Sequence, residues 1–99
     1  MQRKERFERL RVASDEGNPA LTVELAKLYL AQFPDDAWAL IYFGMALQDL
    51  ARYEEARSAF KSALAVMPAE NHERLYRQLG LLSQDESKFA EAEDRKSVV

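Results

Sequence analysis

The stretch from Ala37 to Pro68 restricts the fold of this chain more than any other. Apolar residues recur in it at helical spacing on either side of a short predicted turn at Leu50–Arg52. Small and large apolar residues fall at fixed offsets, at Leu40, Phe43, Gly44, Leu47, Tyr53, Ala56, Phe60, Ala63 and Pro68. Because small residues let two helices approach and a large ring fills the space beside them, the pattern predicts a tightly packed antiparallel helix pair.

The composition favours helices along the whole chain. Of the 99 residues, 47% are hydrophobic and 31% charged, and only three are Gly and three Pro. This length suits one small domain, so we expect residues 1–99 to form a single unit. The chain has no Cys, which excludes a disulfide framework and thiolate chemistry.

Two further helices are expected before Ala37. The first is Arg3–Glu16, with Phe7, Leu10 and either Val12 or Ala13 facing inward. The sequence Gly17-Asn18-Pro19 should end it, because Gly suits the position after a helix and Pro suits the first turn of the next.

The second expected helix is Ala20–Gln32. One stripe of this helix comprises Leu21, Leu25, Leu28 and Tyr29. Phe33-Pro34 closes this pair, and Asp35 or Asp36 is expected to cap the helix that follows.

The spacing resembles the tetratricopeptide repeat (TPR), which has Leu-Gly on its first helix, Ala-x3-Phe on its second and a terminal Pro. Gly44, Ala56, Phe60 and Pro68 match that signature, and Pro34 precedes Pro68 by one 34-residue period. The resemblance implies an all-α, right-handed α-solenoid of antiparallel helix hairpins. About two and a half repeats are expected, at approximately 3–34, 35–68 and 71–99, the last incomplete. The first repeat is degenerate, since Ala26 and Tyr29 align with Phe60 and Ala63 and so exchange large and small residues.

The third repeat is expected from a second match to the same spacing. Gly80, Phe89 and Ala92 follow one another at the intervals of Gly44, Tyr53 and Ala56. This register needs a two-residue insertion after Pro68. It predicts a turn at Asp85-Glu86-Ser87 and a last short helix from about Lys88.

The helix predicted at Asp36–Leu50 is apolar nearly all round. One stripe can be covered by the next helix, and the other contains Trp38, Ile41, Tyr42 and Met45. By resemblance, these four occupy the concave face on which this family binds peptides or partner helices. The alternative is that Ile41 and Met45 lie in the interior, since a middle helix has neighbours on both flanks.

Arg74, Arg77 and Gln78 begin the third repeat, on the helix that would continue the concave wall. They could hold a carboxylate of a ligand, or they could be ordinary solvated side chains. One subgroup of the family grips the C-terminal carboxylate of chaperones, but Phe7, Arg11, Tyr42 and Met45 stand at the equivalent places here and only Arg74 matches. That activity is therefore not expected.

The resemblance implies a non-catalytic interaction module with a protein or peptide partner. The alternative is a structural or self-assembly piece, either part of a longer repeat array or a homodimer formed through its C-terminal end. That end, Ser97-Val98-Val99, has no polar capping helix, and Leu79, Leu81 and Leu82 would need a cover.

Other classes of function are not supported by residue patterns. There is no Ser-His-Asp set, phosphate loop or Cys nucleophile, so we expect neither an enzyme nor a bound cofactor. His72 is the only His and no second ligand lies at a suitable helical spacing, so no metal site is expected.

The charge pattern argues against nucleic acid and membrane partners. The net charge is −3, and the five basic residues of 3–11 alternate with Glu5 and Glu8 as on a solvated helix. The longest apolar run, Ala37–Leu47, is well short of the ~20 residues that span a bilayer. We therefore expect a cytoplasmic protein.

Overall fold

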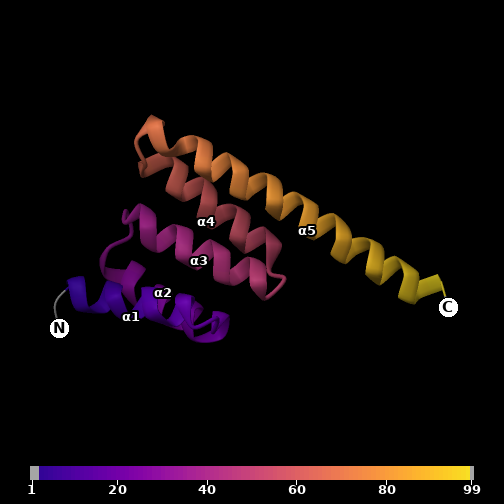
Figure 1. Cartoon of the computed structure of the whole chain (residues 1–99), viewed down its shortest axis with the longest axis horizontal. Coiled ribbons are helices and arrows are strands. Elements are labelled where there is room, and N and C mark those ends of the chain that lie inside the picture. Colours follow the sequence, from indigo (N-terminus) through magenta and orange to yellow (C-terminus); the bar gives the residue numbers. More distant parts are fainter. Residues whose placement is uncertain (1–2, 99) are drawn as a thin grey trace.

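The computed structural model describes residues 3–98, and the side chains of residues 3–92 (Figure 1). Within this range the chain is all helical, as the composition predicts, and contains no strand. The elements are α1 (Arg3–Asp15), α2 (Pro19–Gln32), α3 (Ala37–Asp49), α4 (Tyr53–Val66), a short 3₁₀ turn (Ala69–Asn71) and α5 (His72–Val98).

The boundary between α1 and α2 forms as its residues predict. Gly17 adopts φ = 72°, a left-handed conformation that costs glycine little. Asn18 caps α2 by accepting the Leu21 N–H at 3.2 Å, and Pro19 takes the first helical position.

The ends of α3 are likewise set by local chemistry. Asp36 caps the helix by accepting the Ala39 N–H at 3.2 Å. After α3 the chain reverses at Leu50–Arg52, where Ala51 adopts φ = 61°. The predicted turn is therefore confirmed.

The five helices lie side by side, with α3 in the middle (Figure 1). The α1–α2 pair packs on one side of α3, and α4 packs on the other side and supports α5. Two apolar clusters result. The cluster of α1, α2 and α3 contains Leu10, Ala26, Tyr29 and Ala39. The cluster of α3, α4 and α5 includes Leu40, Leu47, Phe60, Leu75 and Leu82.

A close helix contact lies between α3 and α4, at Gly44. A Cβ atom added to Gly44 would lie 2.7 Å from Cε1 of the buried Phe60 ring. The small residue predicted at this position is therefore required by the approach of the Phe60 ring.

The turn predicted at Asp85-Glu86-Ser87 is wrong, because α5 runs unbroken through these residues. No Gly or Pro lies between Gln84 and Lys88 to interrupt it. Side chains of α3 and α4 also contact this part of α5 and stabilise it as a helix. Gln48 Nε2 donates to Asp85 Oδ2 at 2.7 Å, and Arg57 pairs with Glu86. The region predicted to form a third repeat is thus one long helix, which projects past α4 (Figure 1). The apolar end predicted at Ser97-Val98-Val99 lies outside the residues whose side chains are described.

The apolar stripe of α2 is only partly covered by the neighbouring helices. Of its members only Tyr29 is buried, whereas Leu25 is half-buried and Leu21 and Leu28 are exposed. The helix instead turns Thr22, Val23, Ala26 and Tyr29 inward. Because α2 carries apolar residues on more than one face, its periodicity could not decide which face the neighbouring helices cover.

Among the described residues, no helix combines the length and the apolar character needed to cross a bilayer.

Candidate functional site

The most exposed aromatic side chain of α3 lies beside a cation from α5. Trp38, in the first turn of α3, keeps 42% of its surface exposed. The guanidinium carbon of Arg74 lies 5.4 Å from the centre of the Trp38 ring. This is a cation–π arrangement, stabilising by about 0.5–1 kcal/mol at an exposed site. Among residues 3–92, Arg74 has no carboxylate partner within ion-pair distance.

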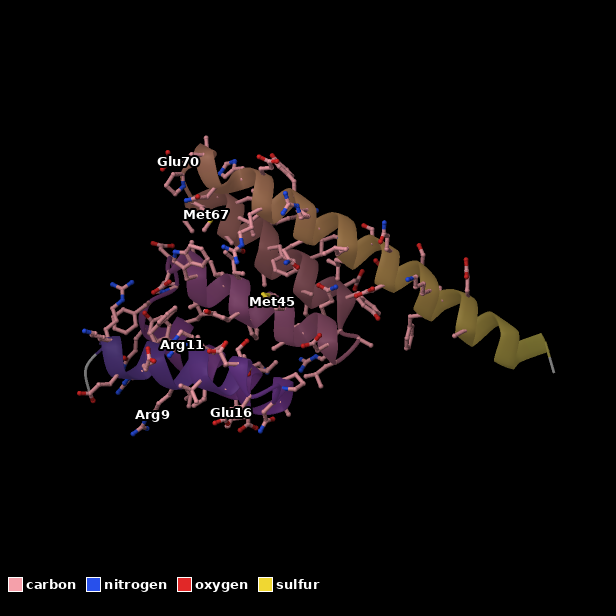
Figure 2. The ribbon with its side chains drawn as sticks, in the orientation of Figure 1. Arg9, Arg11, Glu16, Met45, Met67 and Glu70 are labelled. Carbon is pink, nitrogen blue, oxygen red and sulfur yellow. The ribbon has the colours of Figure 1, made fainter. Side chains whose placement is uncertain are left out.

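The other predicted residues of α3 divide between core and surface. Ile41 is 5% exposed and belongs to the core, which is the alternative that its position left open. Met45 is 36% exposed at the middle of the helix (Figure 2). Tyr42 is half-buried, and its ring centre lies 5.9 Å from that of Phe7 in an edge-on contact. Two of these side chains, Met45 and Tyr42, therefore extend the surface next to Trp38.

On α5, Gln78 is half-buried and lies one turn after Arg74 on the same helix face. Leu81 continues this face, is 46% exposed, and was not predicted as a binding residue. Its spacing of seven residues from Arg74 was the available signal. The guanidinium of Arg77 instead lies 3.9 Å from the Glu73 carboxylate, and the Arg77 side chain is 71% exposed.

The α1 edge of this surface is electrically neutralised. Arg11 donates to Asp15 at 2.7 Å and also pairs with Glu8. The Arg11 hydrogen bond is the main reason that the pKa of Glu8 is lowered. Because Arg11 is engaged in this way, Arg74 is the cation that remains available for a ligand.

The start of α3 is fixed by a polar cluster that joins three helices. Tyr29 is buried, and its hydroxyl donates to Asp36 at 2.6 Å and accepts from Arg3 at 3.0 Å. Burial, and then the bond to Asp36, raises the pKa of Tyr29. Burial alone would raise the pKa of Asp36, but the hydrogen bonds from Tyr29, Ala39 and Arg3 together lower it. This cluster sets the position of Trp38, two residues after Asp36.

His72 has a local partner at the start of α5. Its Nε2 donates to the carbonyl oxygen of Met67 at 2.8 Å, which ties the end of α4 to the beginning of α5. Within the described part of the chain, no three His, Cys, Asp or Glu side chains gather closely enough to hold a metal ion. His72 therefore stabilises the turn that precedes α5.

Comparison with known proteins assigns no family to this chain. No family model matches it, and no curated protein or solved structure does so either. Its function must be inferred from the surface around Trp38 and Arg74.

Proposed function

We propose that this chain is a non-catalytic interaction module that binds an extended or helical protein segment along α1, α3 and α5. One observation carries the proposal, namely the exposed Trp38 ring with the Arg74 guanidinium beside it. Trp and Arg are the residue types that most often dominate binding energies at protein interfaces. Met45 and Leu81 extend the apolar part of the surface on either side.

The scaffold we propose is a right-handed, TPR-like array. Two helix pairs, α1–α2 and α3–α4, succeed each other with the 34-residue spacing of Pro34 and Pro68. The approach of Phe60 to Gly44 is the type of close contact for which the signature selects small residues. In this scaffold α5 supplies a single helix after two complete hairpins.

The ligand that fits this surface combines an apolar side chain with a nearby carboxylate. The apolar group would rest on Trp38 and Met45. The carboxylate, from Asp, Glu or a C-terminus, would pair with Arg74, which has no acidic partner among residues 3–92.

Trp38 is the only Trp of the chain and reports directly on this surface. In the free protein its fluorescence should be red-shifted and quenchable. We would titrate peptides that carry two apolar side chains and a free C-terminal carboxylate, together with their C-terminal amides. Binding should shift the emission to the blue, and the amides should bind more weakly.

Three variants test which side chains contribute. Trp38→Ala should cost about 1–3 kcal/mol of binding by calorimetry, as expected of an interface hot spot. Arg74→Ala should abolish the difference in affinity between the carboxylate peptides and their amides. Arg77→Ala, which changes an exposed Arg on the same helix, should preserve that difference. Emission that is already blue and unquenchable in the free protein would remove Trp38 from the surface and end the proposal.

The second candidate function is self-assembly through α5. Tyr76 is 61% exposed and Phe89 45% exposed on this helix, so part of its apolar surface is uncovered. Sedimentation velocity over a range of concentrations distinguishes the two functions. A protein that stays monomeric at high concentration would exclude self-assembly without affecting the peptide proposal.

A further inference from the structure

The outer side of the α1–α2 pair carries an apolar surface that the proposed function does not use. Leu28 is 69% exposed, Leu21 is 41% exposed, and Val12 on the neighbouring helix is 39% exposed. Leu21, Leu25 and Leu28 follow the i, i+4, i+7 spacing of one helix face. The leucines of this stripe thus lie mostly at the surface.

This surface is hollowed into two adjoining depressions between α1 and α2. The first, of about 470 Å³, is lined by Leu25, Leu28 and Tyr29 together with Arg6 and Arg9. The second, of about 510 Å³, is lined mainly by Val12, Ala13, Leu21 and Leu25 and by three glutamates. Both include Arg9 and Leu25, so together they form one groove along the helix pair, which we call the outer groove.

Charge is unequally divided along the outer groove. Arg6 and Arg9 border the first depression, and Arg6 donates to the neutral amide of Gln32. Among residues 3–92 neither arginine has a carboxylate within ion-pair distance. Glu5, Glu8 and Glu16 border the second depression together with Arg9. Glu8 is paired with Arg11, so among residues 3–92 Glu5 and Glu16 supply the uncompensated negative charge of this depression. In Figure 2, Arg9 and Glu16 lie along the edge of the molecule away from α3.

We propose that the outer groove binds an amphipathic helix of a partner protein. The helix would place leucine-like side chains, spaced i, i+4, i+7, against Leu21, Leu25 and Leu28. It would carry carboxylates over Arg6 and Arg9 and a basic side chain over the glutamates of the second depression. A groove between two helices accepts the side-chain ridge of a third helix, and the divided charge selects the one whose charges are complementary.

The probe is a synthetic peptide of about 18 residues, long enough to form a helix on binding. Its apolar face carries Leu at i, i+4 and i+7, with Glu flanking one half and Lys the other. A second peptide has Lys in place of every Glu. Fluorescence anisotropy of the labelled peptides should show that the wild-type protein prefers the Glu/Lys peptide.

Variants of the groove distinguish specific docking from general adhesion. Arg6→Glu combined with Arg9→Glu should lower the affinity for the Glu/Lys peptide about tenfold and raise the affinity for the all-Lys peptide. Leu28→Glu removes exposed apolar surface and should lower the affinity for both peptides about tenfold or more. Two controls should change nothing: Val66→Glu, an exposed apolar residue on α4, and Trp38→Ala, which reports on the other surface.

Two results would overturn the inference. One is equal affinity of the wild-type protein for both peptides, or affinity that Leu28→Glu leaves unchanged. The other is concentration-dependent self-association that Leu28→Glu abolishes, without any peptide binding, because the occupant would then be a second copy of this chain. Neither result would bear on the Trp38 surface.

Discussion

The α3–α4 pair and α5 start from the same spacing of residues but fold differently. Gly44, Tyr53 and Ala56 in the pair correspond to Gly80, Phe89 and Ala92 in α5. At Gly44 the Phe60 ring fills the space of the missing side chain, whereas no atom lies within 4 Å of the Cβ position of Gly80. A small residue therefore permits a close helix contact but does not create one.

The turns differ for a related reason. Reversal after α3 places Ala51 at φ = 61°, a left-handed conformation costing roughly 1–2 kcal/mol for a residue with a side chain. Burial of Ala56 and Phe60 against α3 offsets this cost. In α5 the corresponding Ala92 is exposed. Unlike Ala56, Ala92 is not covered by a packed helix, and α5 continues without a reversal.

The largest expected difference between the two regions concerns their aromatic rings. Phe60→Ala empties a fully buried site and should lower the free energy of unfolding by about 3–5 kcal/mol. Phe89 is 45% exposed and its ring contacts that of Tyr53, so Phe89→Ala should cost less than about 1.5 kcal/mol. Urea denaturation followed by circular dichroism measures both. Equal losses would mean that Phe89 is as well covered as Phe60.

Alanine at the two glycines should change stability in opposite directions. Gly44→Ala places a methyl group against the Phe60 ring and should destabilise by about 1–3 kcal/mol. Gly80→Ala fills open space in a helix and should stabilise by roughly 0.5–1 kcal/mol, because Ala is the better helix former. Thermal and urea unfolding show whether each variant is more or less stable than the wild type. A neutral Gly44→Ala would refute the close contact on which the comparison depends.

A smaller, pH-dependent effect is expected where α3 begins. The pKa of Asp36 is lower in the folded state, so its contribution is present above the unfolded pKa of about 3.9 and is lost as the pH falls through the folded value. Asp36→Ala removes this contribution together with a helix cap and should cost about 0.5–2 kcal/mol at pH 7. Lowering the pH from 7 to 3 should therefore reduce the free energy of unfolding of the wild type more than that of the variant. If the free energies of unfolding of both proteins fell equally with pH, the Asp36 carboxylate would not be coupled to folding.

Much of the fold could be predicted because its signals are local. Gly17, Asn18 and Pro19 specify the first boundary through their own backbone and capping preferences, and Asp36 does the same for α3. One prediction failed where packing between distant residues decides the outcome. The turn at Asp85–Ser87 was inferred from a repeated spacing, and the leucine stripe of α2 likewise did not specify which face the neighbouring helices cover.

The candidate surface was predictable only in part for the same reason. An apolar helix with two stripes suggested Trp38 and Met45, which are exposed, but also Ile41, which α3 turns into the core. Proximity of Arg74 to Trp38 depends on where α4 places α5 relative to α3, which no local pattern specifies. Leu81 was not predicted as a surface residue because leucine is most often buried in the core.

The continuity of α5 is the central claim of this comparison, and one distance tests it. Because the chain has no native Cys, Arg77→Cys and Arg95→Cys introduce two unique sites for spin labels. Double electron–electron resonance should give a separation near 27 Å, since 18 residues of α-helix rise by about 1.5 Å each. A chain that turns back at Asp85–Ser87 would bring the two backbones to about 10 Å, and a main distance there would contradict the account.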